Sequence, residues 1–324
     1  MRKPWIVGVA GAVLAALLLG ACGDPESAPG EAPPSAAAPD TSPTTRQRAS
    51  TASPGTEADA ENDADADADA DNDADGAKPA PKVLYLGDSL AMENQDVLGK
   101  FLKDDLDARY TSAPYGGTTL CDYLEGTADR SLVPAQDKAA ALVRRLSPDY
   151  VVLQFWGNAW DYTPCMDGVT YGKARAEYFR RYTAAAEQLT DQIANAGGTH
   201  RPTIVWVLQG PDPMTPDRVR RVNALYEKQA RASGDMVADA GRAVSPAADR
   251  YAWTQYLPCT AYEREHDGYC TQPGRARTAL HHDKDYLHFC LAPTTSKPRP
   301  CPVLSPGITR MARAITRAIA DRAS

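Results

Sequence analysis

The chain has 324 residues, which is enough for a domain with a sizeable hydrophobic core and excludes a miniprotein held together by disulfides alone. Its formal charge of −7 is unevenly spread, since residues 23–80 carry −11 whereas residues 81–324 carry +2. A folded part with so little positive charge does not indicate a nucleic-acid-binding protein.

The first 22 residues have the pattern of an export signal. Arg2 and Lys3 precede an apolar run, from Trp5 to Ala21, that is shorter than most membrane-spanning helices. The run ends in Leu-Gly-Ala-Cys, which resembles the lipobox of bacterial lipoproteins. We therefore expect a lipoprotein signal peptide over 1–22 and a lipid on Cys22 that anchors the exported chain to the outer face of a membrane. An ordinary signal peptide that ends near a cysteine is the alternative.

Residues 23–80 have no aromatic side chain and consist mainly of Ala, Pro, Ser, Thr, Gly, Asp and Glu. This composition cannot bury a core, and its acidic groups repel one another, so we expect a disordered, extended linker. The alternating Asp-Ala run from Asp63 to Asp75 offers carboxylates to calcium. It lacks the Gly turn and fixed spacing of a calcium loop, which favours a solvated spacer.

Residues 81–324 alternate short apolar runs with amphipathic stretches, which predicts an α/β domain with a central parallel sheet. The region 241–284 shows no clear period, and we interpret it as a long disulfide-held insertion over one end of the sheet. Gln154 is the polar residue that interrupts an otherwise apolar predicted strand. In chain order we expect strands at 83–86, 109–113, 150–156, 203–208 and 236–238, and helices at 91–106, 135–146, 178–193, 216–232 and from 306 onward.

The number of cysteines is consistent with an exported protein. Six remain besides Cys22, an even number that favours disulfides formed in an oxidising compartment, although six cysteines allow fifteen pairings. Zinc is the alternative, but the chain has no Cys-x-x-Cys and its His residues are not interleaved with the cysteines as zinc ligands are. Short spacings favour Cys259–Cys270 and Cys290–Cys301, which leaves Cys121–Cys165.

The candidate chemistry begins where the first predicted strand meets the first helix, at Gly87-Asp88-Ser89. A serine at this turn lies at the carboxyl end of the sheet, where open α/β folds bind ligands, and beside helix N–H groups that favour negative charge. Ser89 therefore has the position of a nucleophile, although serine is also a common helix cap.

A serine nucleophile needs a base and a carboxylate that orients the base. Asp285 and His288 lie three residues apart near the end of the domain, and Glu263 with His266 repeats this spacing. A metal site built from the neighbouring 281–283 run, His-His-Asp, is the alternative, but so many ligands on one loop would need distant partners that the sequence does not supply.

These two motifs, early and late around an α/β core, resemble the SGNH or GDSL hydrolase family over nearly all of 81–324. The resemblance implies a flavodoxin-like three-layer α/β/α sandwich with a central parallel sheet. It also implies a triad of Ser89, Asp285 and His288, and an oxyanion hole made by the Ser89 N–H, a glycine after the second strand and an asparagine after the third. Here these positions fall on Gly117, with Gly116 as the fallback, and on Asn158.

The sequence departs from the family's Gly-x-Asn-Asp block, because Trp156 and Ala159 stand where the block has Gly and Asp. The aromatic residues Trp156, Trp160 and Tyr162 follow the third strand, and their rings suit sugar or acyl groups as well as ordinary packing.

The leading function is that of a serine esterase acting on short acyl esters, for which envelope or extracellular glycans are the candidate carriers. An acyltransferase with the same triad, in which a sugar hydroxyl resolves the acyl-enzyme, and a non-catalytic envelope-binding module are the alternatives. We expect no cofactor and no metal. The expected partners are an ester substrate, small or glycan-borne, and a membrane reached through Cys22; we expect a monomer that binds no nucleic acid.

Overall fold

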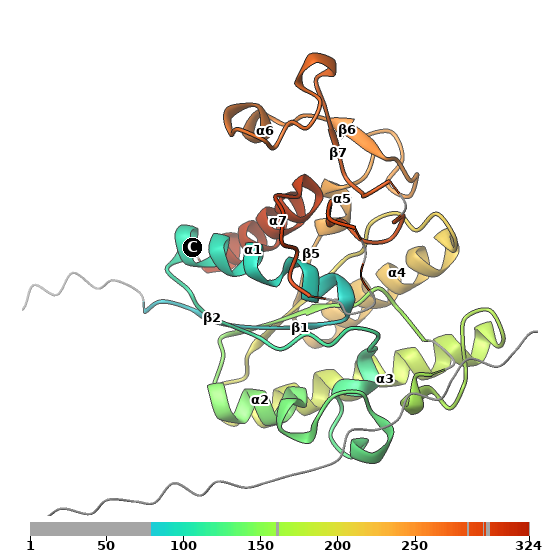
Figure 1. Ribbon diagram of the computed structural model, residues 1–324. Coiled ribbons are helices and arrows are strands. Elements are labelled where there is room, and N and C mark those ends of the chain that lie inside the picture. Colours follow the sequence, from blue (N-terminus) through green and yellow to red (C-terminus); the bar gives the residue numbers. More distant parts are fainter. Residues whose placement is uncertain (1–78, 160–161, 284, 294, 296–298, 324) are drawn as a thin grey trace, which may run out of the picture. The chain divides into compact units, whose positions relative to one another are not determined.

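Five parallel strands form the central sheet of the computed structural model (Figure 1), which describes residues 79–159, 162–283, 285–293, 295 and 299–323. These residues fall within one compact unit, Asn72–Ser324. The predicted signal peptide with Cys22, the linker up to residue 78, and Trp160 lie outside the described residues.

The strand order is β2-β1-β3-β4-β5, which is the flavodoxin-like order of a doubly wound fold. Every neighbouring pair is parallel, because a helix or a longer crossover returns the chain to the same edge between successive strands. The strands are β1 (Lys82–Gly87), β2 (Arg109–Ser112), β3 (Tyr150–Gln154), β4 (Thr203–Val207) and β5 (Met236–Ala238).

Helices cover both faces of the sheet and bury a separate apolar cluster on each. Alternate residues of β1 show the division, since Leu84 and Leu86 belong to one cluster and Val83 and Tyr85 to the other. The first cluster packs under α2 (Ala139–Leu146), α3 (Arg175–Ala196) and α4 (Pro216–Ser233), and the second under α1 (Ser89–Leu106), α5 (Ala240–Ala243) and α7 (Pro306–Ala323). The expected three-layer α/β/α sandwich is confirmed.

The predicted third strand ends two residues earlier than expected, at Gln154. Its side chain is fully buried, and its Oε1 accepts hydrogen bonds from the Tyr85 hydroxyl and, at 3.2 Å, from Asn94 Nδ2. The polar interruption in the apolar run is therefore satisfied inside the core. Residues 155–158 turn across the carboxyl edge of the sheet, where the candidate site lies.

The region 241–284 contains regular structure that its sequence did not predict. Two short strands, β6 (Tyr256–Pro258) and β7 (Arg277–Ala279), pair antiparallel, and α6 (Ala261–Glu265) follows the first of them. Elements of three to five residues are too short to show a period. Figure 1 shows this insertion beyond α1 and α7, where Arg310 of α7 pairs with Glu263 at 2.6 Å.

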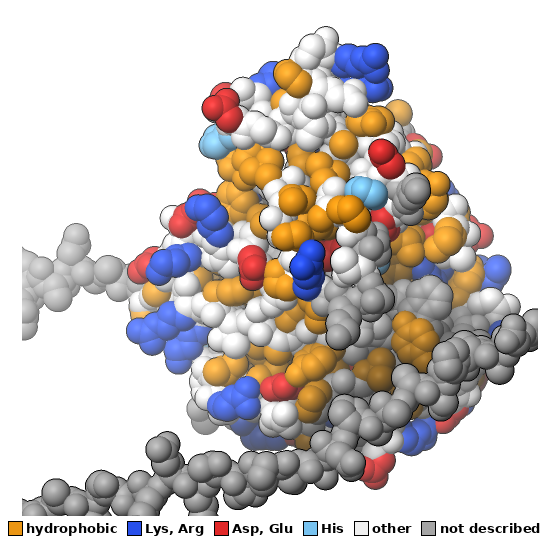
Figure 2. All heavy atoms as spheres, viewed as in Figure 1, with side chains coloured by type: hydrophobic (Ala, Val, Ile, Leu, Met, Phe, Trp, Pro, Cys, Tyr) orange, Lys and Arg blue, Asp and Glu red, His pale blue; other side chains and the backbone are white. Residues whose placement is uncertain are grey.

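Both signs of charge are interspersed over the face of the molecule that Figure 2 shows, and hydrophobic side chains gather below the insertion. Within the described part of the chain, no helix combines the length and the apolar character that crossing a bilayer requires.

Three disulfides are present, Cys121–Cys165, Cys259–Cys270 and Cys290–Cys301, which are the pairings that the spacing suggested. They are typical of a protein that folds in an oxidising compartment outside the cytoplasm.

The close contact between β1 and β3, at the end of β1, can be tested by substituting Gly87. A Cβ atom added to Gly87 would lie 2.1 Å from the backbone oxygen of Gln154 and 2.5 Å from the Cβ of Ala91. We expect Gly87→Ala to lower the free energy of unfolding by at least about 2 kcal/mol, because backbone must shift to admit the methyl group.

Urea unfolding measures this loss. Gly172→Ala is the matched control, since a Cβ there would meet no heavy atom within 4 Å, and it should change stability by less than about 0.5 kcal/mol. Equal stability of the two variants would contradict the close strand contact.

Candidate active site

Ser89 lies where the resemblance placed the nucleophile, at the carboxyl end of β1 and in the first position of α1. Asp88 is the N-cap of that helix, and its Oδ1 accepts the Leu90 N–H at 3.0 Å. The sequence folds this way because the short apolar strand ends in a glycine that fits against β3, after which the cap starts the helix at once.

The structure brings Ser89, His288 and Asp285 together across 199 positions of sequence separation between the serine and the histidine. His288 Nε2 lies 3.0 Å from Ser89 Oγ, and His288 Nδ1 lies 3.0 Å from Asp285 Oδ2. Because a carboxylate only accepts, Nδ1 carries the proton and Nε2 offers its lone pair to the serine hydroxyl. Both distances suit general-base catalysis of nucleophilic attack by the serine.

The loop that carries the base is ordered by its own carboxylate. Asp285 Oδ1 accepts the N–H groups of Leu287 and His288, each at 3.0 Å, while Oδ2 orients the imidazole. Burial lowers the pKa of His288, but the hydrogen bond that His288 donates to Asp285 and the charges of Glu93, Asp285 and Asp88 outweigh burial and raise that pKa above its usual value. The surroundings therefore favour the imidazolium that forms during attack.

Gly117 lies in a turn beside the end of β1, where the Tyr115 N–H donates to the carbonyl of Gly87 at 2.9 Å. Gly117 has a φ of +79°, which favours glycine, whereas Gly116 is not among the positive-φ residues. A Cβ at Gly117 would also come within 3.1 Å of the hydroxyl of Tyr162, whose side chain is 58% exposed. The backbone conformation thus favours glycine at this position, and the Tyr162 side chain would have to shift slightly to admit a Cβ.

Asn158 is buried at the carboxyl end of β3 and shares an acceptor with the backbone of its own loop. Asp88 Oδ2 accepts the Trp156 N–H at 2.7 Å and Asn158 Nδ2 at 3.2 Å. An amide nitrogen has two hydrogens, so this bond orients the side chain and leaves a second donor for a substrate oxygen. The altered Gly-Asn spacing therefore still gives a fixed amide.

Two tyrosines from the helical layer fix the same loop. The Tyr178 hydroxyl donates to the carbonyl of Gly157, and the Tyr226 hydroxyl donates to that of Phe155 at 3.1 Å. Trp156 is only 2% exposed and belongs to the core beneath α1 and α7, so its ring is not a substrate platform. Of the two described aromatic residues considered for that role, Tyr162 is the accessible one.

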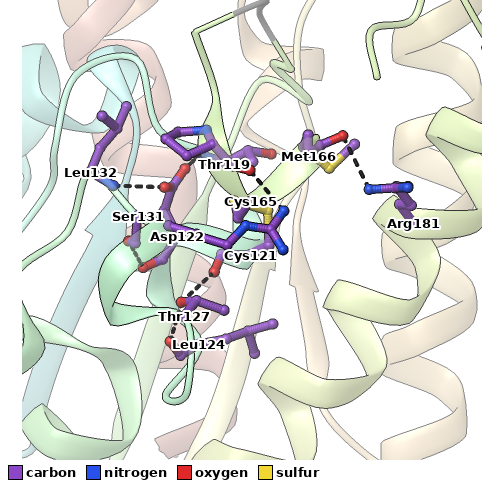
Figure 3. Close-up of a disulfide and its surroundings, with 12 residues drawn as sticks. Thr119, Cys121, Asp122, Leu124, Thr127, Ser131, Leu132, Cys165, Met166 and Arg181 are labelled. Atoms are coloured by element: carbon purple, nitrogen blue, oxygen red, sulfur yellow. Dashed lines mark hydrogen bonds between the residues drawn. A yellow bond between two sulfur atoms is a disulfide. The ribbon is translucent and has the colours of Figure 1, made fainter. Parts of the chain in front are cut away.

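The disulfide Cys121–Cys165 joins the segments that follow Gly117 and Asn158 (Figure 3). On one side, Asp122 Oδ1 accepts the Leu132 N–H at 2.9 Å, and on the other Arg181 donates to the carbonyl of Met166 at 3.2 Å. The residue that follows each cysteine is thus hydrogen-bonded to a neighbouring segment. The covalent bond restricts movement of the two candidate oxyanion segments relative to each other.

The insertion supplies two aromatic donors to the catalytic loop. His281, 3% exposed, lies 2.8 Å from the His288 carbonyl through Nδ1, and Trp253 Nε1 donates to the Tyr286 carbonyl at 3.1 Å. Burial lowers the pKa of His281, which favours a neutral ring whose Nδ1–H donates to that carbonyl. The rings of His281 and Trp253 also stack at 5.4 Å.

The metal alternatives do not fit these contacts. His281 is committed to the carbonyl of His288, and the six cysteines are disulfide-bonded rather than thiolate ligands. Across the ranges that the structure describes, no group of three or more His, Cys, Asp or Glu side chains has the arrangement of a metal site. Glu263, whose spacing to His266 repeats that of the triad pair, instead pairs with Arg310.

Sequence reasoning missed four residues at this site: Asp88, Glu93, Trp253 and His281. Asp88 is part of the Gly-Asp-Ser motif and was passed over because its local role as a helix cap gives no sign of the bonds to the distant 156–158 loop. Glu93 lies about one helical turn after Ser89 on α1, whereas Trp253 and His281 reach the site only through tertiary contacts.

Comparison with known proteins finds no matching family model and no matching curated protein. Among solved structures, the periplasmic domain of a Salmonella ser. Paratyphi A lipopolysaccharide acetyltransferase is 10% identical, with a TM-score of 0.45 over 74% of this chain and 83% of that one. The inhibitor-bound aryl esterase of M. smegmatis is 14% identical (TM-score 0.42; 75% and 99% covered). A Clostridium thermocellum family 3 carbohydrate esterase is 13% identical (TM-score 0.41; 75% and 96%).

The bridging role of Asp88 can be tested by Asp88→Asn. An amide places an N–H₂ group where Oδ1 or Oδ2 now accepts, so the Trp156–Asn158 loop should lose its fixed position. We expect kcat for ester hydrolysis to fall roughly 10- to 100-fold, with KM nearly unchanged. Asp235→Asn is the control, because it removes a buried carboxylate that accepts the Ile204 N–H at the opposite edge of the sheet. Equal kcat losses in both variants would contradict the bridge.

The support from His281 can be tested by His281→Phe, which keeps an aromatic ring and removes the donor to the His288 carbonyl. We expect kcat to fall roughly 10-fold and His281→Asn, whose Nδ2 can replace Nδ1, to recover part of it. His266→Phe is the control, since His266 Nδ1 bonds the Tyr262 carbonyl at 2.8 Å elsewhere in the insertion. If His266→Phe lowers kcat as much, the effect comes from the insertion as a whole.

Proposed function

We propose that this chain is an exported serine esterase that hydrolyses carboxylic esters through an acyl-enzyme on Ser89. The observation that carries the proposal is the continuous hydrogen-bonded path from Ser89 Oγ through His288 to Asp285, both steps at 3.0 Å. Two further observations support it: the turn that carries Gly117 is bonded to Gly87 through the Tyr115 N–H, and Asn158 Nδ2 donates to Asp88 beside the serine. Acyl transfer requires oxyanion donors close to the nucleophile.

In the proposed reaction, Ser89 Oγ bonds to the ester carbonyl carbon while its proton passes to His288 Nε2. The carbonyl oxygen becomes an oxyanion that the Ser89 and Gly117 N–H groups and Asn158 Nδ2 stabilise, and Asp285 stabilises the imidazolium. The C–O bond to the alcohol then breaks and His288 returns the proton to the leaving oxygen. Water, deprotonated by His288, attacks the acyl-enzyme, which releases the acid and restores Ser89.

We further propose that the acyl groups are short and that envelope or extracellular glycans bear them. The disulfides favour an oxidising compartment, and a lipid on Cys22 would keep the domain at a membrane surface. The acyltransferase alternative uses the same first half-reaction, with a sugar hydroxyl in place of water. A binding module would need neither the serine nor its base.

The test follows hydrolysis of p-nitrophenyl acetate and of a longer-chain ester by the full chain, in parallel with Ser89→Ala and His288→Ala. We expect an acetate preference and a loss of roughly 10³-fold or more in kcat/KM in both variants. Ser233→Ala, near the opposite edge of the sheet, is the control. Wild-type hydrolysis no faster than that of the two site variants would contradict the esterase.

The same assay with an added sugar alcohol separates the first two functions. Acylated sugar in excess of free acid would indicate the transferase. If there is no turnover and Ser89→Ala retains full affinity for an acetylated glycan, the domain is a binding module instead.

A further inference from the structure

A second carboxylate lies on the same face of α1 as Ser89. Glu93 follows the serine by four residues, which is about one helical turn, so both side chains point towards the segment that carries the base. Glu93 and His288 line one cavity of about 40 Å³, whose wall also includes Cys290 and Arg299. The mechanism above makes no use of Glu93.

Glu93 is attached to the segments on both sides of the Cys290–Cys301 disulfide. Its backbone carbonyl accepts the Cys301 N–H at 3.1 Å. Its carboxylate faces the N–H groups of Phe289 and Cys290, the two residues after the base. The buried Oε2 makes no hydrogen bond with any residue in the described part of the chain. A buried carboxylate oxygen without a donor is costly, so stability alone does not explain a carboxylate at this position.

The charge of Glu93 acts on the catalytic base. It is the largest contribution, after burial and the Asp285 hydrogen bond, to the pKa of His288, and it raises that pKa. Among the residues that the structure describes, the other ionisable groups around Glu93 are Asp285, which opposes its ionisation, and Arg299 on the cavity wall. Asp88 faces His288 from the neighbouring turn.

We propose that Glu93 is a positioning residue for His288, a second carboxylate beside Asp285 that fixes the segment after the base and adds a negative charge to the imidazole. This inference rests on the proposed function of the same site. It extends the triad by one group, placed one helical turn after the nucleophile on the same helix.

The proposal has a consequence for the pH dependence of activity. Burial raises the pKa of Glu93 to about 7, and the pKa of the neighbouring His288 is also raised above its usual value. Two interacting groups that titrate together lose their protons in two steps that belong to the pair. The fall of kcat/KM at low pH, its acid limb, should therefore extend over a wider pH range than a single ionisation gives. The negative charge of Glu93 should also move this fall to higher pH.

The test is Glu93→Gln, which keeps the shape and an acceptor oxygen but removes the charge. We expect the acid limb of kcat/KM to move about 1 unit to lower pH and to become that of one ionisation, because the imidazolium loses a favourable partner. Asp96→Asn is the matched control, since it removes an equal charge from an exposed position of α1 and should leave the limb in place. A folded, active Glu93→Gln enzyme with the wild-type limb would overturn the proposal.

A second readout does not need turnover. The imidazole of His288 can be titrated by NMR in the Ser89→Ala background, with and without Glu93→Gln. A lower His288 pKa in the double variant supports the coupling even if the chain hydrolyses no ester, and an unchanged pKa overturns it. If Glu93→Gln does not fold, Glu93→Asp, which retains the charge, should keep the wild-type acid limb with a lower kcat; a shift to lower pH would count against the proposal.

Discussion

The buried carboxylate of Asp88 joins the two halves of the candidate site. Its Oδ1 caps the helix that begins at Ser89, and its Oδ2 accepts from the backbone of Trp156 and the amide of Asn158. Burial raises the pKa of Asp88 to about 6, although N–H donors and the charges of His288 and Arg218 oppose that rise. In return, one carboxylate fixes the helix that begins at Ser89 relative to the loop that carries Asn158, the candidate oxyanion donor.

The remaining contacts of the site serve the same purpose, which is to fix loops that the sheet alone would leave free. The 155–158 loop is attached to α3 and α4 by tyrosine hydroxyls, and the Gly117 segment is tied to it by a disulfide. The loop of the base is bonded by its own Asp285, and from outside by Trp253 and His281. Preorganised donors are effective because they need not reorganise when charge develops.

Local patterns were enough to predict much of this molecule. Apolar strand ends, helix stops and short cysteine spacings reflect forces that act over a few residues, so β5 was predicted at its observed bounds and two cysteine pairs were anticipated. The third pair, Cys121–Cys165, was what remained once those two were assigned. The triad candidates came from the turn at Ser89 and the spacing of Asp285 and His288, and the resemblance assigned their roles; the structure brings those residues together.

The predictions that failed share one physical cause. Each concerned a feature that depends on contacts between segments far apart in the chain. The third strand was extended to Trp156 because an apolar run does not show where hydrogen bonding to neighbours ends; β3 stops once its neighbours β1 and β4 have ended. Trp156 was considered for substrate contact, whereas its ring fills the core under α1 and α7. The insertion has elements too short for any period, and its two donors to the catalytic loop are visible only after folding.

The electrostatics of the site follow from placing Asp88, Glu93 and Asp285 around a single imidazole. Burial raises the pKa of Asp88 and of Glu93, whereas the charge of His288 opposes that rise. In the proposed reaction His288 takes the serine proton, and the same carboxylates then gain a positive neighbour that favours their ionised forms. This attraction grows as charge develops, and only such a difference between ground state and transition state accelerates a reaction.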